Sequence, residues 1–210
     1  MQFEVTILGS NAAIPALDRH PSAQILNVND HLYLIDCGEG TQMRMNQYKI
    51  RRHRIHQIFI SHLHGDHIFG LIGLLTSYSL NKRTERLTIF SPEGLQELIE
   101  VQLKLTASYL SYPLEFIVVD PTISNEIFSD KTLTVYTLPL IHRIPACGYL
   151  FREHSRPLNV IPEQLEKYGI PFTQINDLKK GKNGVAKNGE EIDNQLLTLP
   201  PYQQRTFAYC

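Results

Sequence analysis

The sequence predicts an α/β protein, because short apolar strands alternate with helical segments over much of its 210 residues. The alternation is clearest at 57–105, where two strand-like runs are each followed by a helical segment. The first run, QIFIS at 57–61, is almost continuously apolar, which is typical of a strand buried on both faces. Both observations favour helices packed against the faces of a sheet.

The N-terminal part of the chain predicts three strands and one helix. Gly9-Ser10 supplies a turn after the first β-branched, apolar run. Asn29-Asp30 lies between two further runs and is typical of a hairpin turn. The expected strands are 3–9, 23–28 and 31–36, followed by helix-forming residues at 38–48 and a basic loop at 49–56.

The middle of the chain continues this pattern. Residues 67–80 are apolar nearly all round, which predicts a helix packed deeply against the sheet. The further expected elements are a strand at 86–91, a helix at 92–105, and strands at 114–120, 132–140 and 146–151.

Residues 152–204 differ in character, since they are rich in Pro, Gly, Asn and Lys and poor in long apolar runs. Pro162 and Gly169 bracket a short predicted helix. Asn188-Gly189 is typical of a type I′ hairpin turn. We therefore predict a core at 1–151, an inserted segment at 152–204, and a returning core strand at 205–210.

The composition gives no sign of a membrane partner. The formal net charge is −1, so no overall field indicates a nucleic acid or a membrane. Three widely spaced cysteines are typical of a reducing compartment. The N-terminus lacks a signal-peptide pattern, and no apolar run is long enough to span a bilayer. We expect a cytoplasmic protein.

The most informative segment is SHLHGDH, which follows the predicted buried strand. His62 and His64 are two positions apart at a strand end, so their imidazoles can point to one spot. Gly65 permits a sharp turn that brings Asp66 and His67 to a second spot nearby. Imidazole nitrogens and carboxylate oxygens are suitable ligands for zinc or a similar divalent ion.

Two simpler interpretations compete with a metal centre of this kind: exposed or capping histidines, and a single structural zinc site. The order H-x-H-x-D-H between a strand and a buried helix favours the metal centre. The segment resembles the signature of the metallo-β-lactamase fold superfamily. The resemblance implies an αββα sandwich, a dinuclear metal site at the edge of its two sheets, and a hydrolase.

Further segments resemble ribonuclease Z, the endonuclease family that removes the 3′ trailer from precursor tRNA. The resemblance implies a zinc-dependent phosphodiester hydrolase with two zinc ions, which leaves a 3′-hydroxyl on the tRNA and a 5′-phosphate on the trailer. It also implies a homodimer in which the inserted segment is a flexible, tRNA-binding arm. The segments are LGSNAAIPALDRHPSA, LIDCGEGTQMRM, GLIGLLTSYSLNKR, LTIFSPEGLQELIE and IHRIPACGYLF.

The same resemblance implies the metal ligands. His142 falls where the family has its next metal-binding histidine, although a single histidine of this kind is also typical of a buried structural residue. Asp66 is the implied proton acceptor, and whether it acts as a base or mainly as a ligand stays open. The implied ligands of one metal are His62, His64 and His142, and those of the other are Asp66 and His67.

Three further positions have implied roles with competing interpretations. Asp36 would support a ligand histidine from behind the metal site, or it would be a helix N-cap. Pro15 and Arg19 match a motif that many relatives carry near the bound 3′ end, where Leu17 and His20 depart from it. Arg19 would contact phosphate, or be an exposed arginine without a role.

The inserted segment at 152–204 has seven basic and seven acidic residues, so its positive charge is confined to a local cluster and does not cover the whole segment. Lys179, Lys180 and Lys182 form a cluster that would contact RNA phosphates, or simply be solvated. The loop at 49–56 is the densest basic stretch and has the same two interpretations.

The sequence stops at Cys210, where the resemblance implies further metal ligands beyond it. We therefore expect an N-terminal portion of a ribonuclease Z, with an incomplete second metal site. Two alternatives remain: another hydrolase of this fold that acts on small phosphodiesters or thioesters, and a truncated, inactive module that binds metal or RNA.

Overall fold

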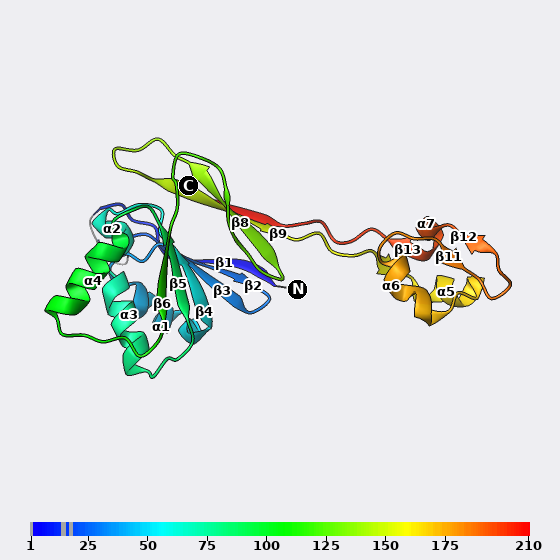
Figure 1. Cartoon of the computed structure of the whole chain (residues 1–210), viewed down its shortest axis with the longest axis horizontal. Helices are drawn as coiled ribbons and strands as arrows, with labels where there is room; N and C mark the ends of the chain where they lie inside the picture. The colour runs from blue at the N-terminus through cyan, green and yellow to red at the C-terminus, as the bar shows by residue number, and fades with distance from the viewer. Residues whose placement is uncertain (1, 14–15, 17–18) are drawn as a thin grey trace. The chain divides into compact units, whose positions relative to one another are not determined.

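The computed structural model describes residues 2–13, 16 and 19–210. The chain forms two compact units, shown in Figure 1. The first unit comprises Met1–Phe151 and Thr206–Cys210, and the second comprises Arg152–Arg205. The inserted unit thus ends one residue later than the sequence predicts.

The first unit contains a six-stranded sheet with the strand order β1-β2-β3-β4-β5-β6. Its first three strands pair antiparallel, and β3 to β6 pair parallel. Asn29 and Asp30 both have positive φ, of 51° and 70°, so the hairpin turn predicted there is confirmed. The strands are Phe3–Gly9, Ala23–Val28, His31–Ile35, Ile55–Phe59, Leu87–Ser91 and Leu114–Val118.

Helices cover one face of this sheet. Leu71, Leu74 and Leu75 pack against buried strand residues such as Ile58 and Ile89. The helices of this unit are α1 (Thr41–Gln47), the short η1 (Arg52–Arg54), α2 (Gly65–Ile68), α3 (Leu71–Leu80) and α4 (Leu95–Leu105).

The single helix predicted at 67–80 is wrong, because the segment forms two helices. Helix α2 ends at Ile68 and α3 begins at Leu71. Between them, the backbone N–H of Gly70 donates to the carbonyl of Cys37 at 2.9 Å. A tertiary hydrogen bond therefore lies at the break between the two helices, at a position where the apolar pattern of the sequence shows no interruption.

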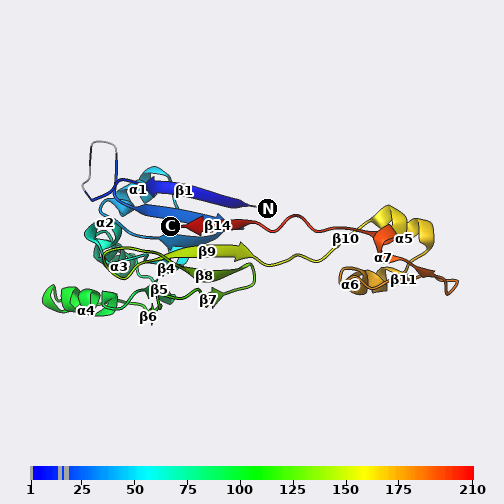
Figure 2. The ribbon, with the colours of Figure 1, turned by 90° about the horizontal axis from the view of Figure 1, so that it is seen from above.

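A second sheet lies on the other face of the first, as the views in Figures 1 and 2 show. Its strand order is β14-β9-β8-β7. Aromatic side chains fill the space between the sheets, where Phe59 and Phe90 stack with ring centroids 4.8 Å apart. The strands are β7 (Glu126–Ser129), β8 (Leu133–Pro139), β9 (Cys147–Glu153) and β14 (Thr206–Tyr209).

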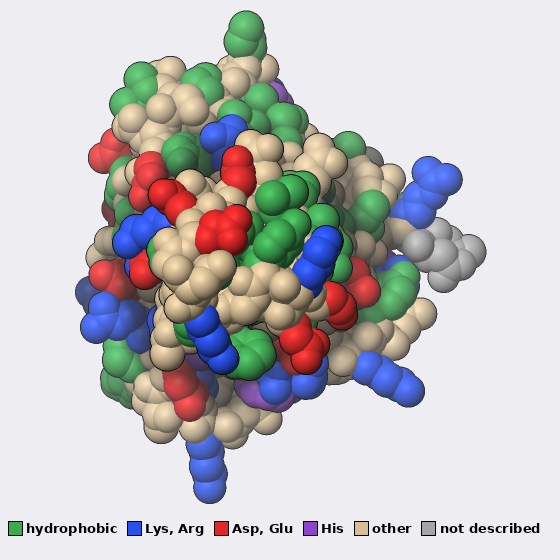
Figure 3. Space-filling view, turned by 90° about the vertical axis from the view of Figure 1, so that its right-hand side faces the viewer, with side chains coloured by type: hydrophobic (Ala, Val, Ile, Leu, Met, Phe, Trp, Pro, Cys, Tyr) green, Lys and Arg blue, Asp and Glu red, His purple; other side chains and the backbone are tan. Residues whose placement is uncertain are grey.

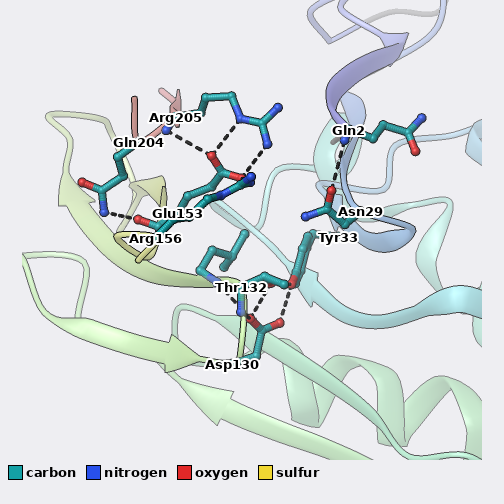
Figure 4. A network of polar contacts seen from close by, with 10 residues as sticks. Gln2, Asn29, Tyr33, Asp130, Thr132, Glu153, Arg156, Gln204 and Arg205 are labelled. Atoms are coloured by element: carbon teal, nitrogen blue, oxygen red, sulfur yellow. Dashed lines mark hydrogen bonds and ion pairs between the residues drawn. The ribbon is translucent and has the colours of Figure 1, made fainter. Parts of the chain in front are cut away.

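One buried hydroxyl ties the two sheets together. Tyr33 of β3 donates to the Asp130 carboxylate at 2.5 Å, in the turn between β7 and β8 (Figure 4). The first unit thus consists of helices, a sheet and a second sheet in layers, and the expected α/β class is confirmed. Among the described residues, no helix is long and apolar enough to cross a membrane.

The second unit has its own small apolar core, which includes Leu165, Leu178 and Leu197. Helix α5 has Pro162 in its first turn and ends at Gly169 in the left-handed region, as predicted. Its elements are β10 (Asn159–Val160), α5 (Pro162–Tyr168), η2 (Phe172–Gln174), α6 (Ile175–Leu178), β11 (Gly184–Val185), β12 (Glu191–Ile192), α7 (Asn194–Leu197) and β13 (Thr198–Leu199).

The type I′ turn predicted at Asn188-Gly189 is wrong. Only Gly189 has positive φ, of 87°, and its N–H donates to the carbonyl of Ala186 at 2.9 Å. The N–H of Ala186 in turn donates to the carbonyl of Glu190, which leaves a three-residue loop. A loop of this length closes with one left-handed residue, whereas a two-residue type I′ loop needs two.

Glu153 joins the two chain segments at the start and the end of the second unit (Figure 4). Its side chain is 4% exposed and accepts from Arg205 Nη2 at 2.6 Å and from Arg156 Nη2 at 3.0 Å. The Gln204 side chain donates to the Glu153 carbonyl. Hydrogen bonds from Arg205 hold the pKa of the Glu153 carboxyl below its ordinary value.

We predict that Glu153→Gln lowers the free energy of unfolding by about 2 kcal/mol near neutral pH, because it removes charge-assisted hydrogen bonds. The folded-state pKa is lowered, so this stabilisation is present above the ordinary pKa and is lost as the pH falls through the lowered value. The difference between wild type and variant in urea unfolding should therefore shrink in acid.

The matched control is Asp177→Asn, which breaks the exposed ion pair with Lys182 in the same unit. Exposed pairs contribute little, so this variant should unfold like the wild type. Equal losses for both variants, or a Glu153→Gln loss that persists in acid, would contradict the prediction.

Candidate metal centre

The candidate site lies where the parallel strands of the first sheet end. Parallel strands place their carboxyl ends at one edge, so residues that follow β3 and β4 become neighbours. The Asp36 backbone N–H donates to the Phe59 carbonyl at 2.8 Å, which fixes the first residue after β3 beside the end of β4. The Cys147 N–H donates to the Ser61 carbonyl at 3.0 Å and attaches the second sheet to the same edge.

Three imidazoles gather at this edge. Ligand nitrogens of His62, His64 and His142 all lie within 4.8 Å of one another. His142 Nε2 is 3.2 Å from His64 Nδ1. Two nitrogens on one tetrahedral zinc ion are roughly 3.3 Å apart, given Zn–N bonds of about 2.0–2.1 Å. This donor set therefore fits a divalent metal ion.

Asp66 and His67 lie beside that cluster. The Asp66 Oδ2 atom is 3.7 Å from His67 Nε2, and the His67 ring centroid is 4.0 Å from that of His62. Asp66 Oδ2 also accepts from the Ala13 backbone N–H at 2.8 Å, which brings the loop after β1 to the site. The structure thus places both implied ligand groups next to each other.

A single buried carboxylate supports two of the histidines. Asp36 Oδ2 accepts from His67 Nδ1 at 2.6 Å, which leaves His67 Nε2 free to bind a metal. The same oxygen accepts from Ser61 Oγ at 2.8 Å, and Ser61 Oγ lies 3.0 Å from His62 Nδ1. If His62 Nδ1 donates to this hydroxyl, its Nε2 atom is also free to bind a metal.

Asp36 is not the cap of the helix that follows it. Helix α1 has Gly40 at its N-cap position and no side-chain capping bond. Both oxygens of Asp36 accept hydrogen bonds from other groups instead, including the Ser61 N–H at 2.8 Å. The capping interpretation is therefore wrong.

Gly65 lies beneath the Phe69 ring at the start of α2. Its φ is not in the left-handed region, and it is the first residue of α2. A Cβ atom at this position would lie 2.2 Å from the Phe69 ring, which covers the Gly65 backbone. Phe69 is 66% exposed, so its ring can move aside for a larger residue. The chain enters α2 without a left-handed conformation at Gly65, which corrects the expectation that glycine is needed there for a sharp turn.

The charges of the site follow from burial and from the neighbouring groups. Burial, followed by the nearby His67, lowers the pKa of His62 to about 4. Burial opposes protonation of His67 as well, but the hydrogen bond to Asp36 and the charges of Asp36 and Asp66 together outweigh it and raise the pKa of His67 above its ordinary value. Burial would raise the pKa of Asp66, yet the Ala13 N–H and His67 keep it below the usual range.

Three site residues were missed by sequence reasoning. Arg143 Nη2 lies 3.4 Å from His64 Nε2, and the side chain lines a cavity of about 410 Å³ that Asp66 and Phe69 also line. Ser61, the first residue of the SHLHGDH segment, links Asp36 to His62 through its hydroxyl. Tyr209, near the end of the sequence, donates to Asp36 Oδ2 at 2.5 Å. Only the position of Arg143 beside His142 in the sequence could have indicated one of them.

The implied substrate residues are all exposed. Arg19 is exposed, and its backbone forms paired hydrogen bonds with Ala16, while Pro15 and Leu17 lie outside the described residues. Lys179, Lys180 and Lys182 are exposed in the second unit.

We predict that His142→Ala lowers the affinity for zinc at least tenfold, because it removes one of three clustered nitrogen ligands. Competition with a chromophoric chelator measures this affinity. The control is His53→Ala, which changes an exposed histidine of η1 and should bind zinc like the wild type. Unchanged affinity in His142→Ala would exclude this residue as a ligand.

Comparisons with known proteins agree with this geometry. Residues 3–154 match the family described as "Anti-Pycsar protein Apyc1". The chain is 41% identical over 209 residues to a protein of Bacteroides fragilis named ribonuclease Z, and the match covers 100% of this chain and 69% of that relative.

Solved structures give the same picture. The human tRNase Z, short form, is similar with a TM-score of 0.63 and 28% identity, over 91% of this chain and 85% of that one. The metallo-β-lactamase fold protein YhfI from Bacillus subtilis has a TM-score of 0.54 and 18% identity, over 79% and 67%, and bears on the fold alone. The chain therefore belongs to the ribonuclease Z family, with a metallo-β-lactamase fold, and its residues 3–154 also belong to the Apyc1 family.

Proposed function

We propose that this protein is a zinc-dependent endoribonuclease that removes the 3′ trailer from precursor tRNA by phosphodiester hydrolysis. The observation that carries the proposal is the imidazole cluster of His62, His64 and His142 beside Asp66 and His67. It occurs in a chain whose relatives at about 40% identity are named ribonuclease Z.

The site would hold two zinc ions. His62, His64 and His142 would hold one, while Asp66 and His67 would contribute to the second. Zinc in such a site lowers the pKa of water and offsets the negative charge that develops on the phosphoryl oxygens.

Asp66 would accept the proton of the attacking water. A carboxylate is a suitable proton acceptor in this position, and the Ala13 N–H and His67, which keep its pKa below the usual range, favour its ionised form. The Ala13 N–H holds its Oδ2 atom at 2.8 Å. Attack on the phosphorus that follows the tRNA part leaves a 3′-hydroxyl on the tRNA and a 5′-phosphate on the trailer.

Arginines near the site would position the RNA backbone. Arg143 lines the cavity that contains Asp66 and His64, where its guanidinium can pair with a phosphate oxygen. Arg19, exposed on the loop that brings Ala13 to Asp66, is a second candidate for phosphate contact.

The second unit would act as the arm that binds tRNA. Lys182 forms an ion pair with Asp177 at 2.8 Å, whereas Lys179 and Lys180 have no ion-pair partner among the described residues. Residues 152–204 contain seven basic and seven acidic residues, so these two lysines offer local rather than uniform positive charge. On the face drawn in Figure 3, basic and acidic side chains are interspersed.

The family resemblance also implies a homodimer in the cytoplasm, with the arm of one subunit serving the site of the other. The cysteines support a reducing compartment, since Cys37, Cys147 and Cys210 are all free thiols. Light scattering on the purified protein tests the dimer.

We predict that the zinc-loaded protein cleaves a 3′-extended precursor tRNA and that a chelator abolishes cleavage. Asp66→Asn should reduce the rate by at least about 10²-fold, because an amide cannot accept the proton. The measurement is single-turnover cleavage with mapping of both product ends, and the control is Glu126→Gln, which changes an exposed carboxylate of β7. Hydrolysis of a chromogenic phosphodiester without tRNA cleavage would instead favour a small-phosphodiester hydrolase.

We also predict that Lys179→Ala combined with Lys180→Ala weakens tRNA binding and makes its dependence on salt less steep by about two phosphate contacts. Lys182→Ala should have a smaller effect, because the charge of Lys182 is already paired with Asp177. Filter binding over a range of salt concentrations measures both quantities. Equal effects of Lys182→Ala and of either single lysine variant would contradict this assignment.

A further inference from the structure

One of the hydrogen-bond donors to the Asp36 carboxylate comes from outside the histidine-rich segment at 61–67. Asp36 is fully buried and accepts from the Ser61 N–H, the Ser61 hydroxyl and His67 Nδ1. Its fourth donor is the hydroxyl of Tyr209, at 2.5 Å from Oδ2. The two residues are 173 positions apart, so only the tertiary fold brings them together.

Tyr209 reaches Asp36 from the second sheet. It belongs to β14, the strand that begins at Thr206, directly after the inserted unit. Its ring packs with the aromatic cluster between the sheets, and β14 pairs with β9 so closely that a Cβ on Gly148 would lie 2.3 Å from the Tyr209 carbonyl oxygen. The pairing of β14 with β9 and the packing of the Tyr209 ring therefore hold the hydroxyl beside the Asp36 carboxylate.

We propose that Tyr209 is a positioning residue for the metal site, acting through Asp36 on His67 and, through Ser61, on His62. A fully buried carboxylate needs several hydrogen-bond donors to satisfy its oxygens and to fix its orientation. Asp36 in turn accepts the Nδ1 proton of His67 and so directs its Nε2 atom to the metal. Partners of this kind change metal affinity by about 10–100-fold when they are removed.

The contact with Ser61 gives Tyr209 a second route to the ligands. The Ser61 hydroxyl donates to the same Asp36 oxygen as Tyr209 and lies 3.0 Å from His62 Nδ1. Loss of the Tyr209 donor would leave Asp36 with fewer fixed partners, and the Ser61 hydroxyl could reorient to compensate. Both ligand histidines would then lose part of their fixed orientation.

Tyr209→Phe tests the inference, which rests on the metal site of the proposed function. We expect zinc affinity, measured by chelator competition, to fall at least tenfold in this variant. We also expect the Nδ1 proton resonance of His67 to shift in the metal-free protein, which a purely structural loss of packing would not cause.

The matched control is Tyr149→Phe. Tyr149 lies in the same aromatic cluster, and its hydroxyl donates to the Ile60 carbonyl at 2.7 Å rather than to Asp36. The variant therefore also removes one buried hydrogen bond but leaves the donors of Asp36 unchanged. Zinc affinity should be unchanged in this control. Equal losses in both variants, or no loss in Tyr209→Phe, would overturn the proposal.

A measurement on the wild type keeps the test independent of whether the variant folds. The Tyr209 hydroxyl proton should exchange slowly with solvent and show a nuclear Overhauser effect to the Nδ1 proton of His67, since both donate to one oxygen. Absence of that contact would overturn the inference. Failure to cleave precursor tRNA, with the Tyr209→Phe loss of zinc affinity intact, would contradict only the proposed function.

Discussion

The buried negative charge of Asp36 is the constraint on which the metal site depends. A carboxylate with no exposure to water is tolerated only when its oxygens are satisfied by donors. Those donors come from the end of β4, from α2 and from the second sheet, so the carboxylate has its full set of hydrogen bonds only when all three are in place. The carboxylate that orients His67 is therefore fully hydrogen-bonded only in the folded core.

The parallel pairing of β3 and β4 makes this arrangement possible. Because the two strands end at the same edge, Asp36 and Ser61 are neighbours although 25 residues separate them. Ser61 then links the carboxylate to His62, and α2 returns His67 to it. His142 is different, since it is exposed on the loop between β8 and β9 and meets the cluster through His64.

A buried carboxylate surrounded by hydrogen-bond donors also joins the two ends of the inserted unit. Glu153 is nearly excluded from water and is surrounded by donors from Arg156, Gln204 and Arg205. The unit thus begins and ends at a satisfied buried charge, and its own apolar core stabilises the rest. The lysines proposed to contact tRNA are on the surface of this unit, where exchange of a side chain does not disturb that core.

Local patterns determined much of what could be predicted. The strand and helix order, the turn at Asn29-Asp30 and the ends of α5 follow from residues within a few positions of one another. The spacing of His62, His64, Asp66 and His67 likewise indicates a metal site, because a strand end followed by one helical turn brings these side chains together regardless of the rest of the fold.

Only the tertiary structure decided the partners of those residues. The support of His67 by Asp36, the approach of Tyr209, the position of Arg143 and the interruption of the helix at Gly70 all depend on which strands pair and which sheet covers which face. A hydrogen bond is directional and short, so its partner is fixed by three-dimensional packing and leaves no periodic signal along the chain. The sequence by itself therefore determined the order of the elements and the chemistry of the metal ligands, and the tertiary structure decided how those ligands are held.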